Sequence, residues 1–264
     1  MAVAIHTPEE FDKMRKAGKL AAQVLDYITP FVQPNVTTNR LNALCHSMII
    51  GNGAIPAPLH YKGYPKSICT SINHVICHGI PNDSNLKNGD ILNIDVTVIV
   101  DGYYGDSSRM YWVGSPSIKA KRLIDVTYEA LMLGIDQVRP GATLGDIGHV
   151  IQTYAESNHY SVVCDYCGHG IGTTFHAEPS VLHYGEKGKG LVLKEGMFFT
   201  IEPMINTGGY ETKLKKHDKW TVTTKDRSLS AQFEHTIGVT KDGYEIFTLS
   251  PKGYTNPPYE SHEI

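Results

Sequence analysis

The feature that most constrains the fold of this 264-residue chain is an internal repeat, in which two short blocks recur in the same order. The block Val32–Thr37 (VQPNVT) returns as Val138–Thr143 (VRPGAT), shifted by 106 positions. The block Leu86–Asp95 (LKNGDILNID) returns as Leu193–Glu202 (LKEGMFFTIE), shifted by 107 positions. A solenoid would repeat more often and at a shorter period. The repeat therefore predicts two related halves.

We predict an α+β fold whose halves, at about 8–115 and 118–249, are related by a pseudo-two-fold axis and join their strands in one sheet. Together they form a single domain spanning 1–264, in which 250–264 is an irregular tail. Asp95 and Glu202 end the two copies of the second block. The symmetry therefore brings these two acids together near the axis.

Local patterns place helices and strands in both halves. Thr7-Pro8 with Glu10 is a capping box, and an apolar stripe from Phe11 onward follows it, which predicts a helix beginning at Pro8. Two β-rich runs flank Asp101-Gly102, a pair that accepts the positive φ angles of a tight turn. The further expected elements are helices at about 38–50, 119–138 and 144–158, a β-hairpin at 91–113, and loop with short strands at 54–81.

The charge and the cysteine content limit the kinds of function that this chain can have. The net charge is −3, so the chain offers no broad basic face to nucleic acid. No apolar stretch approaches the roughly 18 residues of a membrane span, and the first residues do not follow a signal-peptide pattern. The five cysteines suit reduced thiols better than a disulfide framework. We expect a cytoplasmic monomer with no DNA partner and no membrane partner.

Two acids of the predicted hairpin share one face. A two-residue turn at Asp101-Gly102 makes Thr97 face Asp106 and Asp95 face Ser108, so Asp95 and Asp106 are diagonal neighbours. Two ionised carboxylates at this spacing repel each other, so the pair needs a cation or a proton. A solvated hairpin face is the alternative interpretation.

Two further acids favour the cation. Glu202 follows the apolar run Phe198–Ile201, and Glu234 lies in another strand-like segment, where uncompensated acids are costly to bury. A pair of metal ions bridged by carboxylates satisfies all four acids and leaves room for a bound water. The glycines around His169 let the backbone turn closely about an imidazole ligand.

At this point the chain resembles the bacterial type I methionine aminopeptidases, which share the pita-bread fold of prolidases and creatinase, with two halves around a curved antiparallel sheet. The resemblance covers essentially the whole sequence. The motifs that carry it are Tyr166–Gly172 (YCGHGIG), His176, Val181–Tyr184 (VLHY), Asn93–Thr97 (NIDVT), Gly105-Asp106, Ile201–Met204 (IEPM) and Ser230–His235 (SAQFEH).

The resemblance implies a metalloaminopeptidase that removes the initiator methionine from nascent proteins and prefers a small second residue. A water or hydroxide bridging two divalent ions would be the nucleophile, and Glu202 would shuttle its proton. Cobalt, manganese and iron(II) suit the donor set, and zinc is also compatible. The implied metal ligands are Asp95, Asp106, His169, Glu202 and Glu234, of which Asp106 and Glu234 bridge both ions.

The resemblance also implies a substrate site. His176 would stabilise the oxyanion, and His78 would contact the peptide on the leaving-group side. Pro58 and Lys62 depart from the residues common in bacterial relatives, at the rim of the pocket. We assign no chemistry to His183, although it belongs to the signature. The expected substrate-binding residues are Tyr61, Tyr64, Cys69, His78, Phe175, His176 and Trp220.

Three further expectations concern secondary features. The resemblance implies a sodium or potassium ion near the backbone of Asn73 and Val75 and the side chain of Ser230. The Cys164-x-x-Cys167 pair has no second pair to complete a zinc ribbon and no thioredoxin-like context, so we expect neither site. The expected partners are peptides with N-terminal methionine and nascent chains, with transient association with the ribosome.

Two alternatives remain at this stage. An X-Pro dipeptidase would share the fold, but such enzymes usually carry an additional N-terminal domain. A catalytically dead protein of this fold would serve as a binding module, but such proteins lose ligands, and all five are present here.

Overall fold

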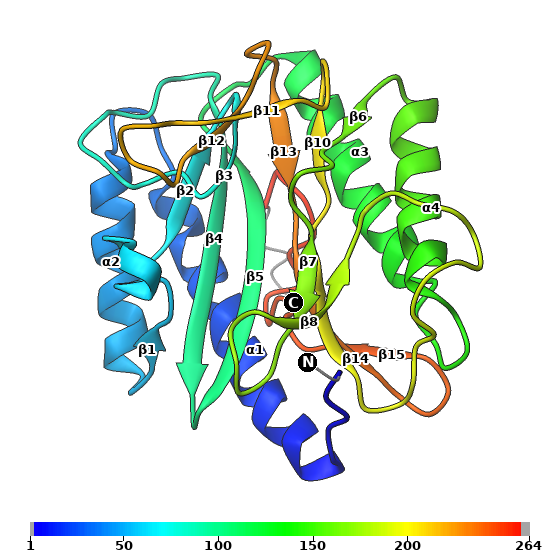
Figure 1. Ribbon diagram of the computed structural model, residues 1–264. Helices are drawn as coiled ribbons and strands as arrows, with labels where there is room; N and C mark the ends of the chain where they lie inside the picture. The colour runs from blue at the N-terminus through cyan, green and yellow to red at the C-terminus, as the bar shows by residue number, and fades with distance from the viewer. Residues whose placement is uncertain (1–2, 260–264) are drawn as a thin grey trace.

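The computed structural model describes residues 3–259 (Figure 1), and it places two helix pairs on the outer sides of a set of strands. Residues 1–2 and 260–264 lie outside the described part. The first half contains α1 (Pro8–Ile28), the 3-10 turn η1 (Thr29–Phe31), α2 (Thr38–Gly51), β1 (Ile55–Pro56), the 3-10 turn η2 (Tyr61–Gly63), β2 (Cys69–Ile72), β3 (Val75–Cys77), β4 (Ile91–Val100) and β5 (Tyr103–Trp112).

The second half follows with its own helix pair and a more divided set of strands. Its elements are α3 (Ile118–Ile135), α4 (Leu144–Ser157), β6 (Ser161–Val162), β7 (Gly168–Gly170), β8 (Ala177–Val181), β9 (Phe198–Ile201), β10 (Met204–Asn206), β11 (Thr212–Leu214), β12 (Val222–Thr224), β13 (Ser230–Gln232), β14 (His235–Val239) and β15 (Tyr244–Ile246).

Side-chain caps start the four α-helices. The capping box of Thr7 and Glu10 is present at α1. Thr37 and Thr143, the last residues of the first repeated block, cap α2 and α4 through hydrogen bonds to backbone N–H groups. Helix α3 ends at Ile135, three residues before the predicted end, and the N–H of its cap residue Asp136 donates to the Met132 carbonyl.

The two repeated blocks contact each other in the same way in both halves. In each half, the end of the first block pairs with the start of the second block by two backbone hydrogen bonds, one in each direction. The matched bonds are Asn35 N–H to Leu86 O (2.8 Å) and Gly141 N–H to Leu193 O (3.0 Å), then Leu86 N–H to Val36 O (2.9 Å) and Leu193 N–H to Ala142 O (2.8 Å). The sequence repeat is therefore a structural repeat.

The predicted hairpin of the first half is confirmed, with its register. Strands β4 and β5 pair antiparallel, Thr97 faces Asp106, and Asp95 faces Ser108. In the second half, β9 pairs with β14 and β10 with β13, also antiparallel. Glu202 and Pro203 lie between β9 and β10, outside either strand. The registers before and after them place Glu202 opposite Glu234, as Asp95 is opposite Ser108.

The halves meet where β5 and β14 lie side by side. An isolated antiparallel bridge joins Ser108 to Glu234, and the Glu234 N–H donates to the Ser108 carbonyl at 3.1 Å. The Ser107 hydroxyl donates to the Glu234 carbonyl at 2.8 Å. Because Ser108 and Glu234 occupy equivalent positions, the pseudo-two-fold axis passes between them.

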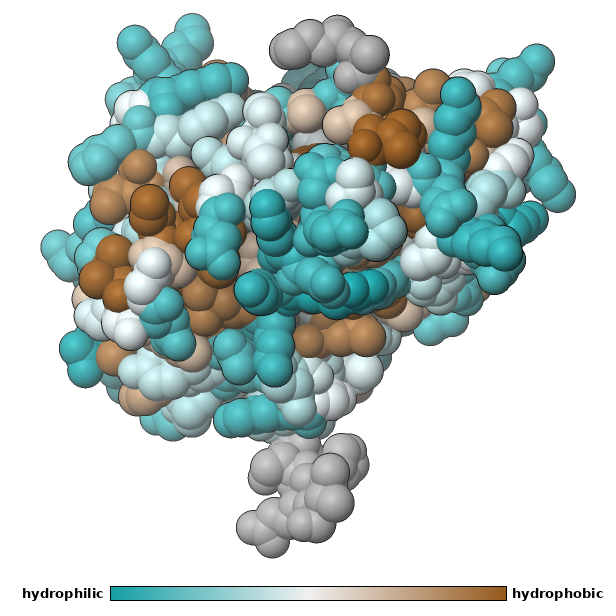
Figure 2. All heavy atoms as spheres, turned by 90° about the horizontal axis from the view of Figure 1, so that it is seen from below, coloured by the Kyte–Doolittle hydropathy of each residue, from teal (hydrophilic) through white to brown (hydrophobic). Residues whose placement is uncertain are grey.

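Each half has its own large apolar core between helices and strands. Leu25, Leu41 and Ile94 belong to the core of the first half, and Ile124 and Phe199 to that of the second. On the face seen from below, apolar side chains form several groups that are divided by hydrophilic ones (Figure 2). Within residues 3–259, no helix is both long and apolar enough to cross a bilayer.

The final described segment, residues 250–259, contains neither helix nor strand but is held against the first half. The Ser250 hydroxyl donates to Asp26 at 2.7 Å, and the Tyr259 hydroxyl donates to the Met110 carbonyl at 2.6 Å. The rest of the predicted irregular tail, 260–264, lies outside the described residues.

Candidate metal centre

A cavity of about 400 Å³ contains the predicted site. It is lined by residues of both halves and by the chain between β10 and β13, and its walls combine acids, histidines and aromatic rings. All predicted metal-ligating, catalytic and substrate-binding side chains line it: Tyr61, Tyr64, Cys69, His78, Asp95, Asp106, His169, Phe175, His176, Glu202, Trp220 and Glu234. Residues that are far apart in the sequence therefore share one space.

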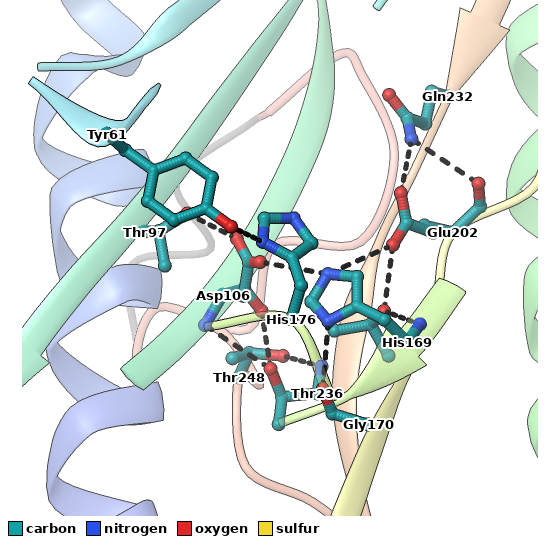
Figure 3. A network of polar contacts seen from close by, with 11 residues as sticks. Tyr61, Thr97, Asp106, His169, Gly170, His176, Glu202, Gln232, Thr236 and Thr248 are labelled. Carbon is teal, nitrogen blue, oxygen red and sulfur yellow. Dashed lines mark hydrogen bonds and ion pairs between the residues drawn. The ribbon is translucent and has the colours of Figure 1, made fainter. Parts of the chain in front are cut away.

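Asp106, His169 and Glu234 form the tightest part of the cluster. Each offers one ligand atom, and these atoms lie within 4.8 Å of one another. His169 Nε2 lies 3.7 Å from Asp106 Oδ2 and 3.6 Å from Glu202 Oε1 (Figure 3). The register of β4 and β5 places Asp95 on the same face as Asp106, so the fifth predicted ligand lines the same wall.

Hydrogen bonds aim the ligand atoms into the cavity. Thr97 Oγ1 donates to Asp106 Oδ1 at 2.7 Å, and Thr200 Oγ1 donates to Glu202 Oε1 at 2.8 Å. His169 Nδ1 lies 3.1 Å from the Gly170 carbonyl, which accepts a hydrogen bond from the protonated Nδ1. The Nε2 lone pair of His169 is then free for a metal ion, as in many histidine ligands with a backbone partner.

The backbone of Glu202 is held by side chains, because the strand ladder is open at this point. Its N–H donates to Nε2 of the fully buried His183 at 3.0 Å. Gln232 Nε2 donates to the Glu202 carbonyl at 3.3 Å and to Oε2 at 3.2 Å. Sequence reasoning gave His183 no chemistry and did not single out Gln232, Thr97 or Thr200. Thr97 had a usable signal in the predicted register, which places it opposite Asp106, and His183 and Gln232 lie within the motifs that carry the resemblance.

Burial changes the protonation of the cluster. Removal from solvent raises the pKa of Asp95 to about 7 and that of Glu202 to about 8. It also raises the pKa values of Asp106 and Glu234 well above normal, and the neighbouring acids add to this effect. Burial lowers the pKa of His169 to about 4, so the ring is neutral at pH 7.

This donor set fits divalent metal ions. Its four carboxylates and one neutral imidazole offer oxygen and nitrogen ligands, and their charges repel each other when all are ionised. Across residues 3–259, no lysine or arginine forms an ion pair with these carboxylates. A bound cation would supply the missing positive charge.

One wall of the cavity is aromatic. The Tyr64 ring packs edge-on against Trp220 at 5.1 Å between centroids, and Tyr61 packs against Phe175 at 4.9 Å. Cys69 lies on β2 directly opposite Asp95 of β4, so the aromatic wall adjoins the acids. The rim residues Pro58 and Lys62 also line the cavity. The combination suits a thioether side chain beside a metal site.

The two non-ligand histidines contact different neighbours in the cavity. The His176 ring is 4.3 Å from the His169 ring between centroids, and its Nδ1 lies 3.0 Å from the Tyr61 hydroxyl (Figure 3). His78 packs edge-on against Trp220 at 6.0 Å. Burial lowers the pKa of His78 to about 4. A Cβ at Gly79 would lie 2.1 Å from the Thr70 carbonyl oxygen, so only glycine can follow His78 here.

The residues of the predicted monovalent cation site lie together outside this cavity. The Asn73 carbonyl accepts the Ser230 N–H at 2.9 Å, and Val75 begins the neighbouring strand β3. Ser230 Oγ is buried, with no hydrogen-bond partner in the described part of the chain. All five cysteines are free thiols; Cys164 donates to the Val162 carbonyl, and Cys167 lines the cavity.

Comparison with known proteins identifies the family. The model of metallopeptidase family M24 matches residues 12–241. A methionine aminopeptidase of Rickettsia prowazekii is 71% identical over 98% of this chain and 100% of its own length. One from Escherichia coli is 54% identical over the full length of both.

Comparison with solved structures gives the same result for the fold. The crystal structure of the Rickettsia prowazekii methionine aminopeptidase superposes with a TM-score of 0.93, covering 94% of this chain and 100% of that one. A prolidase from Pyrococcus horikoshii, 24% identical, shares the fold with a TM-score of 0.71, over 92% of this chain and 63% of its own. The predicted pita-bread fold is therefore confirmed. The chain belongs to metallopeptidase family M24 and, within it, to the methionine aminopeptidases.

Proposed function

We propose that this metallopeptidase removes the N-terminal methionine from peptides and nascent proteins whose second residue is small. The observation that carries the proposal is the shared cavity, in which an aromatic and thiol wall adjoins a five-donor acid and histidine cluster. Such a wall suits the methionine side chain, and the cluster suits the scissile bond beside it. The names of the relatives at 54% and 71% identity agree.

Asp95, Asp106, His169, Glu202 and Glu234 would hold two divalent ions in this proposal. Cobalt, manganese or iron(II) suits this hard donor set, and zinc is compatible with it. When bound, the ions would activate a water at neutral pH and polarise the substrate carbonyl. A sodium or potassium ion near Asn73, Val75 and Ser230 would be separate, and the unpartnered hydroxyl of Ser230 supports it.

The side chains of the chain itself would divide the remaining work. Glu202, whose carboxylate is held by Thr200 and Gln232, would accept the proton of the attacking water and pass it to the leaving amine. His176 would donate a hydrogen bond from Nε2 to the developing oxyanion. His78, beside Trp220, would contact the peptide on the leaving-group side.

The two alternatives are less well supported. The prolidase is similar at 24% identity, which shows the fold alone, and the match leaves more than a third of its length uncovered. A catalytically dead binding module would have no need for five potential ligands around one cavity.

The decisive experiment removes all metal from the protein, restores one ion at a time, and offers Met-Ala-Ser and Ala-Pro peptides in parallel. We expect metal-dependent release of methionine from the first peptide and little cleavage of the second. Failure to release methionine with any ion would contradict the proposal, as would preferential cleavage of Ala-Pro.

The proposed setting follows from this activity. The enzyme would act in the cytoplasm as a monomer on chains that leave the ribosome, with a transient ribosome contact and no DNA or membrane partner. Sedimentation with and without ribosomes measures both points. A stable dimer, or no salt-sensitive cosedimentation with ribosomes, would contradict this setting while leaving the proposed reaction intact.

A further inference from the structure

Tyr61 does more than line the aromatic wall. We infer that Tyr61 is a positioning residue, which fixes the proton of the His176 ring on Nε2 by donating its own hydroxyl hydrogen to Nδ1. The effect on turnover rests on the proposed function, whereas the effect on the ring itself is independent of it.

The geometry of the pair supports a direct hydrogen bond. The Tyr61 hydroxyl oxygen lies 3.0 Å from His176 Nδ1, within the usual range for such a bond. The two rings stack at 5.3 Å with an interplanar angle of 29°. In Figure 3 the Tyr61 hydroxyl points at the near nitrogen of His176, and the other ring nitrogen points away from it. The contact therefore leaves Nε2 free for a substrate group.

Chemistry sets the direction of this bond. A phenol hydroxyl is a good donor, and the unprotonated nitrogen of a neutral imidazole is a good acceptor. With Nδ1 as the acceptor, the single ring proton resides on Nε2. An oxyanion requires a donor at that position, and the other tautomer would present a lone pair to it. The hydroxyl of Tyr61 thus selects the tautomer that the proposed role of His176 requires.

The backbone around Tyr61 is held in an uncommon conformation. Its neighbours His60 and Lys62 both have positive φ, at 69° and 46°, although neither is glycine. The turn is closed by His60 N–H, which donates to the Tyr64 carbonyl at 2.8 Å, and by Gly63 N–H, which donates to the His60 carbonyl at 3.2 Å. Left-handed conformations of this kind cost free energy and persist where the surrounding structure enforces them. Here the result is that Tyr61 reaches His176.

Tyr64 provides a matched contrast within the same wall. Its one hydroxyl hydrogen is shared between the backbone carbonyls of Ile68 and Gly79, at 3.1 and 3.0 Å. Its ring contacts Trp220 rather than His176. The two tyrosines were predicted to have the same role, but only Tyr61 has a hydroxyl bonded to a proposed catalytic group.

Nitrogen-15 NMR of histidine-labelled, metal-free protein tests the inference without any turnover. In the unchanged protein we expect His176 to show the Nε2–H tautomer. In Tyr61→Phe we expect the His176 nitrogen shifts to move toward a mixture of tautomers, and in Tyr64→Phe we expect them to stay. An Nδ1–H tautomer in the unchanged protein would overturn the inference. Shifts of His176 that ignore the loss of the Tyr61 hydroxyl would overturn it too.

Kinetics of the metal-loaded enzyme adds a second readout. Losing one hydrogen bond to a catalytic group should lower kcat about 5- to 10-fold in Tyr61→Phe and leave KM within about twofold. Tyr64→Phe, at a residue whose ring contacts Trp220 rather than His176, should change KM more than kcat.

A double-mutant cycle locates the effect. In a His176→Ala background, Tyr61→Phe should have no further effect on kcat, because the two residues act through one bond. Additive losses, or a raised KM with unchanged kcat, would show that Tyr61 only lines the pocket and does not position His176. If no variant hydrolyses methionyl peptides, the proposed function fails, and the NMR result still decides the role of Tyr61.

Discussion

The two hairpins of this molecule derive from one pattern but differ in regularity. In the first half, β4 and β5 are each 10 residues long, pair without a break and are closed by the tight turn at Asp101-Gly102. In the second half, the ladder is interrupted at Glu202 and Pro203, and residues 207–229 replace the turn. The regular hairpin gives a rigid wall with two acids. At the interruption of the second hairpin, Glu202 and Glu234 line the cavity instead of pairing in a continuous ladder.

The interruption has a local cause. Pro203 has no N–H to donate to a ladder, and the Glu234 N–H donates to Ser108 across the axis instead of to its own hairpin partner. The Glu202 N–H donates to His183, so this buried backbone donor keeps a partner although the ladder is open. The gap therefore lets Glu234 join the two halves while Glu202 keeps a fixed place.

The long connection at 207–229 builds the remaining wall of the cavity. Its strand β12 pairs with β3 of the first half, through Val222 and Cys77. Trp220 lies just ahead of this strand and lines the cavity. The equivalent turn of the first half, Asp101-Gly102, contributes nothing to the cavity lining. This part of the cavity wall is thus built where the symmetry between the halves is weakest.

The largest effect should come from replacing the functional group at position 234, and the matched control replaces the one at the equivalent position 108. Glu234→Gln keeps the size of the side chain but loses the charge needed to hold a cation, so we expect more than about 100-fold loss of activity and loss of bound metal after dialysis. Ser108→Ala removes only the acceptor of the Asn93 amide, at 3.1 Å, and should cost about 1 kcal/mol of stability. Elemental analysis and turnover measure the contrast. Equal metal retention in both variants would contradict it.

The next effect concerns the backbone at the positions equivalent to the interruption. Val96 in β4 corresponds to Pro203, and it is buried within a strand that pairs on both sides. Val96→Pro should destabilise the protein by about 3 kcal/mol or more, because it removes a ladder hydrogen bond. Pro203→Val should change stability by about 1 kcal/mol or less. Denaturant unfolding measures both, and equal losses would show that the second ladder is not open.

These contrasts also show which parts of the structure could be predicted from sequence. The capping box at Thr7, the turn at Asp101-Gly102 and the register that pairs Thr97 with Asp106 are local rules, and the structure agrees with them. The repeat even located the equivalence of Asp95 and Glu202. The contacts of His183 and Tyr61 could not be predicted, because each depends on a partner more than ten residues away, at Glu202 and His176.

A moderate effect should appear with pH, and it compares the two equivalent acids directly. Asp95 and Glu202 titrate near pH 4 in an unfolded chain, but burial raises their pKa values to about 7 and about 8 in the metal-free fold. The folded state therefore binds more protons than the unfolded state, and its stability falls as pH rises. Between pH 7.5 and 8.5, where histidines are already mostly neutral in both states, Tm should fall by a few degrees.

Variants and metal separate the contributions of the two acids. Asp95→Asn should flatten the lower part of this window and Glu202→Gln the upper part, and a saturating divalent ion should abolish most of the slope. A metal-free Tm that rises from pH 7.5 to 8.5 would have the wrong sign for buried acids.

The smallest effect should come from the tight turn that the second half lacks. Gly102 has a φ of +82° and open space where a Cβ would lie, so Gly102→Ala is opposed only by the backbone. This conformation costs an L-residue roughly 1 kcal/mol, which corresponds to a Tm lower by about 2–4 °C in a chain of this size. Gly102→Asn should recover part of the loss, since asparagine accepts positive φ. Activity should not change, because the turn does not line the cavity. If activity fell while Tm stayed the same, the turn of the regular hairpin would affect the reaction itself. The contrast between a supporting first hairpin and an interrupted second hairpin that builds the site would then be wrong.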